Sequence, residues 1–94
     1  MRDNADIRSL ATTLAAVTDE NVMLDFLLDL CTPAELRALS GRWRVVPLLK
    51  AGTPYRDIYD QTGISVTTVG RIARTIELGE GGYNAVFAAR MEEQ

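Results

Sequence analysis

The most constraining feature of the chain is the stretch from Gly52 to Ile76, which reads GTPYRDIYDQTGISVTTVGRIARTI and predicts two short helices joined by a tight turn. Thr53 and Pro54 suit the start of the first helix, with Thr53 as its cap and Pro54 at the first helical position. Gly63 suits its end, because glycine accepts the left-handed backbone conformation that closes helices. Ser65 is a typical N-cap, and apolar residues recur after it at helical spacing, which predicts the second helix.

This pattern is typical of a helix-turn-helix, whose second helix enters the major groove of DNA. If Val69, Ile72 and Ile76 face inward, threonines and arginines remain on the outer face, where they can contact base edges and phosphates. A helical hairpin with a solvated polar face is the alternative, and Tyr59 favours it slightly, because this position usually holds a small residue. Ser65 is assigned to capping, Thr67, Thr68 and Arg71 to base edges, and Arg74, Arg42, Arg44 and Arg56 to phosphates.

The distribution of charge also bears on DNA binding. The net charge of the whole chain is −3, which taken alone argues against a nucleic-acid partner. Residues 1–36, however, hold two basic and seven acidic residues, residues 37–76 hold seven basic and two acidic ones, and residues 77–94 hold one basic and four acidic ones. The positive charge therefore surrounds the predicted helix-turn-helix, as expected of a protein with one DNA-binding face, although a solvated charged face is the simpler alternative.

The N-terminal third of the chain predicts two helices. Residues 5–17 carry an apolar stripe at three- and four-residue intervals, and a second helix, NVMLDFLLDLC, follows capping residues at positions 18–21. The second helix is apolar nearly all round, with Asp25 and Asp29 as a narrow polar line. A chain of 94 residues has too little material to bury such a helix on every side, so we expect a partner chain to cover it.

The remaining segments complete an all-α chain of about six helices. Thr32, Pro33 and Glu35 form a capping-box pattern that begins a long helix, which we expect to reach residue 51 with a kink or break at Pro47. A short terminal helix follows the bend LGEGGY. We interpret the chain as a single domain, residues 1–94. It comprises dimerisation helices and the long helix at 1–51, the helix-turn-helix at 52–78, and the C-terminal tail and short helix at 79–94.

Composition excludes several kinds of site. The chain has no histidine and one cysteine, Cys31, so a zinc site or a histidine-assisted nucleophile cannot be assembled, and we expect neither a metal nor an enzyme. No run of about 18 apolar residues is present, so we expect no transmembrane span. The first ten residues lack the apolar region of a signal peptide, which favours a cytoplasmic protein.

Three blocks of sequence together resemble the Trp repressor superfamily, most closely its YerC/YecD-type branch. They are TPAELRALSGRWRVVPLLKAG, TPYRDIYDQTGISVTTVGRIART and LGEGGYNAVFAAR, and the resemblance covers roughly residues 20–90. It implies an intertwined, all-α homodimer in which the N-terminal and terminal helices interlock. It also implies one helix-turn-helix per subunit, directed toward successive major grooves of double-stranded DNA.

The resemblance also implies where a tryptophan corepressor would bind. In the Trp repressor, a threonine and two arginines hold the tryptophan. These residues correspond to Thr32, Arg42 and Arg71 in this chain. Ile72, however, replaces the small glycine beside the second arginine, and its side chain would occupy the space of the indole, so we expect no tryptophan pocket and no cofactor. Arg42 and Arg71 then remain available for contacts with DNA, and Thr32 is more simply a helix cap.

The sequence thus predicts a dimeric, sequence-specific transcription regulator, most simply a repressor, that binds a near-palindromic operator with half-sites about 10 bp apart or a multiple of that. A small helical adaptor that binds protein through its apolar second helix is the main alternative. A tryptophan-responsive repressor is the other.

Overall fold

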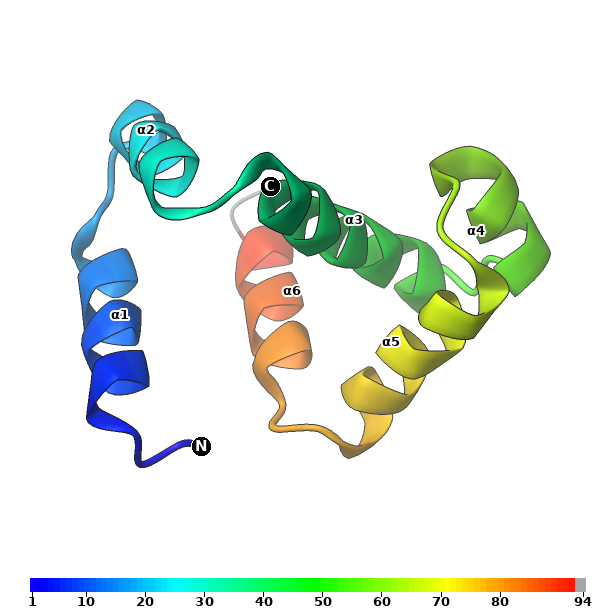
Figure 1. Ribbon diagram of the computed structural model, residues 1–94. Coiled ribbons are helices and arrows are strands. Elements are labelled where there is room, and N and C mark those ends of the chain that lie inside the picture. Colours follow the sequence, from blue (N-terminus) through cyan, green and yellow to red (C-terminus); the bar gives the residue numbers. More distant parts are fainter. Residues whose placement is uncertain (93–94) are drawn as a thin grey trace. The chain divides into compact units, whose positions relative to one another are not determined.

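The computed structural model describes residues 1–92, which form six α-helices and no strand (Figure 1). The predicted all-α fold with about six helices is confirmed. Among the described residues, no helix is both long enough and apolar enough to span a membrane. The helices are α1 (Ala5–Ala16), α2 (Glu20–Leu30), α3 (Pro33–Lys50), α4 (Tyr55–Thr62), α5 (Val66–Leu78) and α6 (Gly82–Glu92).

The chain forms two compact units. The first unit is Met1–Leu36, which holds α1, α2 and the first turn of α3. The second unit begins at Arg37 and holds the rest of α3 together with α4, α5 and α6. The boundary between the units coincides with the change from acidic to basic sequence.

The two helices of the first unit begin at side-chain caps. Asn4 Oδ1 accepts hydrogen bonds from the backbone N–H groups of Asp6 and Ile7, at 2.9 and 3.1 Å, and begins α1. Asp19 Oδ1 does the same for α2, accepting from Asn21 and Val22 at 2.8 and 3.1 Å. Both helices fall where the apolar spacing predicted them.

The first unit nevertheless has no core within the chain. None of its residues is buried, and large apolar side chains of α2 remain open, with Leu24 54% exposed and Leu28 57% exposed. The contacts within the first unit therefore satisfy its helix ends but leave its apolar surface uncovered.

α3 begins at the predicted capping box and runs without a break. The backbone N–H of Thr32 donates to Glu35 Oε1 at 2.7 Å, and the backbone N–H of Glu35 donates back to Thr32 Oγ1 at 3.1 Å. The helix continues past Pro47, so the alternative of a break at that residue was wrong. Val45 and Val46, directly before the proline, are fully buried, and their packing compensates for the missing backbone hydrogen bond.

α3 ends at a motif built on Gly52. The N–H of Thr53 donates to the carbonyl of Leu48, and the N–H of Gly52 donates to that of Leu49, each at 3.0 Å. These paired bonds define a Schellman motif, which needs a left-handed residue, and Gly52 has a φ of 79°. The motif fixes the direction in which the chain leaves α3 toward α4.

The core of the second unit consists of five aliphatic side chains from three helices. Val45 and Val46 come from α3, Ile58 from α4, and Val69 and Ile72 from α5. Half-buried side chains from the same helices, the turn and α6 pack around them: Trp43, Leu48, Leu49, Ile64, Ile76, Tyr83 and Phe87. This core holds the α4–α5 pair against α3.

One boundary in the second unit differs from the sequence prediction. Pro54 is itself the N-cap of α4 and not its first helical residue, and no side chain, that of Thr53 included, forms the expected cap hydrogen bond. Pro54 has a ψ of 145°, which is an extended conformation outside the helix. The Schellman bond from the Thr53 N–H shows that this residue belongs to the end of α3.

The turn between α4 and α5 yields a test of backbone conformation. Gly63 has a φ of 74°, and a Cβ atom added there would meet nothing within 4 Å. We expect Gly63→Ala to lower the free energy of unfolding by about 1–2 kcal/mol, through backbone strain alone. Gly82→Ala is the matched control, because its added Cβ also meets open space but its φ is not positive. Urea unfolding measures both, and equal stability of the two variants would contradict the assignment of strain.

The capping box yields a test of pH dependence. The N–H and hydroxyl groups of Thr32 hold the pKa of Glu35 below its ordinary value, with the backbone hydrogen bond as the larger cause. A lowered folded-state pKa contributes stability that is present above the unfolded pKa of about 4.3 and is lost as the pH falls through the folded value. We expect a carboxyl chemical-shift titration of Glu35 to show this lowered pKa.

The neutral variant Glu35→Gln separates the charge from the geometry, because glutamine also completes a capping box. Its unfolding free energy should fall less steeply between pH 5 and pH 3 than that of the unmodified chain. Parallel pH profiles for the two chains would show that the charge of Glu35 contributes nothing to folding.

Candidate nucleic-acid interface

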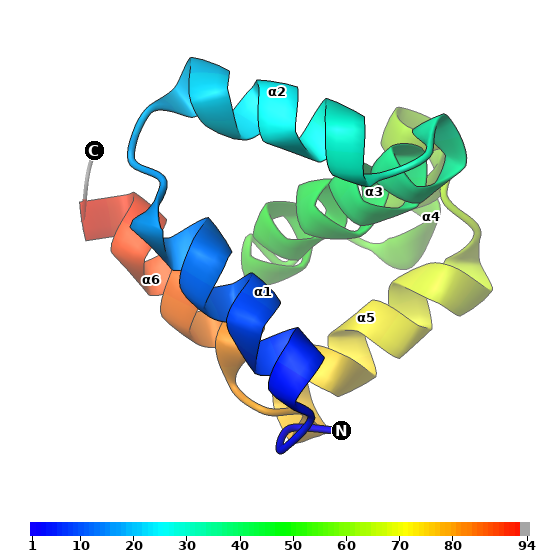
Figure 2. The same ribbon diagram turned by 60° about the vertical axis from the view of Figure 1, so that its left-hand side comes forward.

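The α4–turn–α5 segment has the backbone of a helix-turn-helix (Figures 1 and 2). α4 ends where the N–H of Gly63 donates to the carbonyl of Tyr59 at 2.8 Å, and α5 begins three residues later. Ile64, in the turn, approaches α3 closely: a Cβ on Gly41 would lie 3.1 Å from Ile64 Cδ1. The absence of a side chain at Gly41 therefore lets the turn pack on α3.

Tyr59 does not interfere with the packing of the two helices. Its side chain is 48% exposed, whereas Ile58, one position earlier, is fully buried. The feature that favoured a plain helical hairpin therefore lies on the outer face of α4. Tyr55 of α4, which is 41% exposed, lies beside Gly70 of α5, with an aromatic carbon 3.8 Å from where a Cβ of Gly70 would be.

Ser65 and Thr68 together cap the start of α5. Ser65 Oγ accepts from the backbone N–H of Thr68 at 3.2 Å and donates to Thr68 Oγ1 at 3.0 Å. The predicted N-cap is confirmed. Thr68 is half-buried and shares its hydroxyl oxygen with this cap, whereas Thr67 beside it is exposed. Of these two threonines, Thr67 is the more accessible for a base contact.

α5 has one buried and one exposed face, as predicted. Val69 is fully buried, Ile72 is 3% exposed and Ile76 is half-buried. Arg71 and Arg74 are both exposed. The helix therefore presents threonine and arginine side chains to solvent from a backbone that its apolar face anchors in the core.

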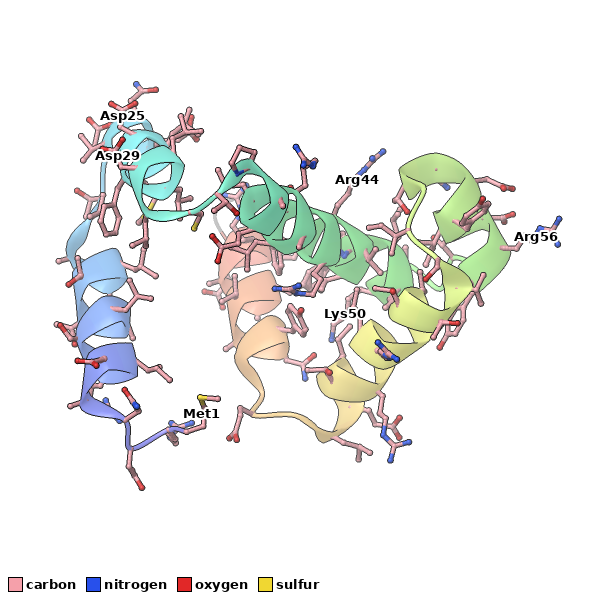
Figure 3. All side chains as sticks on the ribbon, in the orientation of Figure 1. Met1, Asp25, Asp29, Arg44, Lys50 and Arg56 are labelled. Carbon is pink, nitrogen blue, oxygen red and sulfur yellow. The ribbon has the colours of Figure 1, made fainter. Side chains whose placement is uncertain are left out.

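Three of the arginines assigned to phosphates lie on α3 and α4, and two of them, Arg44 and Arg56, differ in their surroundings. Arg56 extends outward from α4 (Figure 3). Arg44, on α3, donates from Nη2 to the backbone carbonyl of Gln61 at 3.1 Å. Gln61 lies in the last turn of α4, where carbonyl groups lack helical donors and carry the negative end of the helix dipole. Arg44 thus caps α4 from α3, and its other N–H groups remain for a phosphate.

The three residues matched to tryptophan binding are placed as follows. Thr32 is in the first unit, and its hydroxyl accepts the capping-box bond from Glu35. Arg42 and Arg71 are exposed residues of the second unit. Ile72, adjacent to Arg71, fills part of the core with Val69. The geometry thus explains Thr32 as a helix cap and Ile72 as a core residue.

An apolar groove of 470 Å³ lies elsewhere in the second unit. Its walls come from α3, the end of α5, the α5–α6 loop and the start of α6, through Trp43, Thr75, Glu80, Gly81, Gly82, Tyr83 and Val86. Neither Arg42 nor Arg71 lines it. This groove is therefore not the place that the resemblance assigns to a corepressor.

Sequence reasoning missed the polar contacts that join the ends of α3, α5 and α6. Lys50 Nζ donates to Asn84 Oδ1, and Asn84 Nδ2 donates to the carbonyl of Ile76 at 3.0 Å. The partners Lys50 and Asn84 are 34 residues apart, so no periodicity or local motif signals the pair.

The fold and the turn define an all-α helix-turn-helix protein, and comparison with known proteins specifies the family. The family model for Trp repressor protein matches residues 5–91. The chain is 30% identical over 78 residues to the uncharacterized protein YerC of Bacillus subtilis (strain 168), an alignment that covers 83% of this chain and 75% of YerC. The chain belongs to the Trp repressor family, and its resemblance to the YerC-type branch is confirmed.

A solved structure agrees with this assignment. The chain is similar to a TrpR-like protein from Eubacterium eligens ATCC 27750, with a TM-score of 0.86 and 31% sequence identity. The match covers 93% of this chain and 90% of that one. The all-α fold is thus shared with a TrpR-like protein.

The Arg44–Gln61 contact yields a test by hydrogen exchange. We expect Arg44→Gln to lower the protection of the Gly63 amide, at the end of α4, by about 0.5–1.5 kcal/mol, the usual contribution of one hydrogen bond. Arg56→Gln is the matched control, since it removes the same charge from α4 itself and should leave that amide unchanged. The same loss of protection in both variants would indicate a general effect of charge.

Proposed function

We propose that this protein is a sequence-specific DNA-binding transcription regulator and not an enzyme. One observation carries the proposal: α5 is anchored by Val69 and Ile72 while Thr67, Arg71 and Arg74 remain exposed along it. A helix that presents threonine and arginine from a fixed backbone is suited to reading base edges in the major groove. Membership of the Trp repressor family supports the same function.

The proposed contacts divide between bases and phosphates. Thr67, Thr68 and Arg71 contact base edges near the start of α5, and Ser65 orients them by capping the helix. Four arginines contact phosphates: Arg74, Arg42, Arg44 and Arg56. Seven of the ten basic residues lie between Arg37 and Ile76, so the attraction for DNA is concentrated in the second unit despite the net negative charge.

The working form that we propose is a homodimer. The first unit buries none of its residues, although α2 is apolar nearly all round. Uncovered apolar surface on this scale favours association with another chain. Two-fold symmetry then predicts a near-palindromic operator with half-sites about 10 bp apart or a multiple of that. Such a protein acts where the chromosome is, so we propose a cytoplasmic location. Membership of the Trp repressor family supports a role as repressor.

No tryptophan corepressor is part of the proposal. Ile72 is 3% exposed and packs among the core side chains, so an indole in that place would have to displace it. Arg42 and Arg71 are then available to DNA. Calorimetric titration with tryptophan tests this point directly, and a saturable heat of binding would restore the tryptophan-responsive repressor.

A helical adaptor that binds another protein is the second candidate. The exposed apolar surface of the first unit favours it, because Leu24 and Leu28 are more than half exposed. The dependence of binding affinity on salt concentration distinguishes the two functions. Affinity that rests on several phosphate contacts falls steeply as salt rises, whereas the affinity of an apolar interface does not.

Selection from a random DNA pool, with the complexes sized in the same run, tests the proposed function. Enrichment of a palindrome by a two-chain species supports the regulator and supplies its operator. No enrichment by a folded, dimeric protein, at low as well as moderate salt, would overturn DNA reading and favour the adaptor.

Arg71 yields the sharpest test of base readout. We expect Arg71→Ala to weaken binding to the selected operator by about 1–3 kcal/mol, while binding to random DNA changes little, if Arg71 binds a guanine through two hydrogen bonds. Arg56→Ala is the matched comparison, because loss of a phosphate contact weakens both kinds of DNA and lowers the salt slope by about 1. Equal losses of Arg71→Ala on both DNAs would make Arg71 a phosphate contact.

A further inference from the structure

The C-terminal ends of α3 and α5 are joined through one side chain of α6. Lys50, the last residue of α3, donates from Nζ to Asn84 Oδ1. Asn84, on α6, donates from Nδ2 to the backbone carbonyl of Ile76, in the last turn of α5, at 3.0 Å. We name the chain of contacts from Lys50 through Asn84 to Ile76 the α5 latch. Lys50 lies between the helices of the second unit in Figure 3.

The chemistry of the partners dictates how Asn84 is oriented. An ammonium group has only donors and a backbone carbonyl has only acceptors, so the amide oxygen must face Lys50 and the amide nitrogen must face Ile76. Asn84 therefore uses both ends of its amide at once. Among uncharged side chains, only the amides of asparagine and glutamine offer a donor and an acceptor in this fork.

Lys50 is itself held in place. Its Nζ lies 5.7 Å from the centre of the Phe87 ring, within the range of a cation–π contact. Phe87 in turn packs against the core of the second unit. The Schellman motif at Gly52 fixes the backbone directly after Lys50. The Phe87 ring and the fixed C-terminal end of α3 therefore position the ammonium group of Lys50.

The two halves of α5 differ in how they are anchored. The first half holds the cap at Ser65 and two buried side chains, Val69 and Ile72. After Ile72 no residue of α5 is fully buried. Ile76 is half-buried against the core, and Leu78, at the end of the helix, is 66% exposed. Helix ends fray unless side chains satisfy their last carbonyl groups. The latch supplies such a donor to the C-terminal half of α5, at the carbonyl of Ile76.

We propose that Lys50 and Asn84 are positioning residues that hold the C-terminal half of α5, and with it Arg74 and the angle of the DNA-reading face, in place. The inference rests on the proposed DNA-binding function. Neither residue needs to touch DNA: Asn84 acts on the backbone of α5, and Lys50 acts through Asn84.

The only lysine of the chain makes the latch directly observable. Lysine labelled with ¹⁵N at Nζ gives a single side-chain ammonium signal, because Lys50 has no counterpart in the sequence. We expect slow proton exchange at this ammonium and faster exchange in Asn84→Ala. Fast exchange in the unmodified chain, or exchange unchanged in Asn84→Ala, would overturn the contact.

Backbone hydrogen exchange measures what the latch does to α5. We expect Asn84→Ala to lower the protection of the Leu78 and Gly79 amides by about threefold to tenfold, the range for one hydrogen bond, with protection of α4 unchanged. Asn21→Ala, the same substitution on α2, is the matched control and should leave the amide protection of α4 and α5 unchanged. Lys50→Met should reproduce part of this loss of protection. Lys50→Arg keeps a charged donor and should retain the protection of the unmodified chain.

DNA binding then separates positioning from simple stabilisation. At a temperature where every variant is folded, we expect Asn84→Ala to weaken binding to the selected operator at least threefold, with an unchanged salt slope because no charge is removed. Unchanged operator affinity together with lost protection of α5 would overturn the positioning role. If the unmodified chain selects no DNA, the proposed function fails while the exchange measurements still decide whether the latch holds α5.

Discussion

The structure of the second unit depends on the burial of five aliphatic side chains where three helices meet. Val45 and Val46 are adjacent on α3 and both fully buried, so that helix presents a broad apolar surface. Ile58, Val69 and Ile72 fit against it from α4 and α5. A helix pair of this length is not stable alone in water. The α4–turn–α5 segment therefore keeps its geometry only as long as α3 supplies the other wall of the core.

Three polar contacts of the second unit act at helix ends. Ser65 caps the start of α5, Arg44 caps the end of α4 and Asn84 caps the end of α5. Two of these three caps come from other helices, so they fix the helices relative to one another while satisfying orphan carbonyl groups. The apolar core thus brings the helices together, and the caps add fixed points of contact between them.

Local signals in the sequence predicted most of the fold, and long-range contacts account for what they missed. The caps at Ser65 and Thr32–Glu35 and the left-handed Gly63 depend on neighbours within four residues, so the residue types alone indicate them. Pro47 was misjudged because the packing of neighbouring valines compensates for its lost hydrogen bond. Arg44–Gln61 and Lys50–Asn84 join residues 17 and 34 apart. Side chains that bind DNA remain predictions from exposure and residue type.

The absence of a buried residue in the first unit has a consequence for how such a regulator would be controlled. If α1 and α2 become fully ordered only against a second copy, folding of the first unit is coupled to association, and its stability depends on chain concentration. If no small molecule controls the protein, occupancy of the operator would then follow the amount of protein made. Because two chains assemble per site, that response would be steeper than linear, and the level of synthesis would itself be the signal.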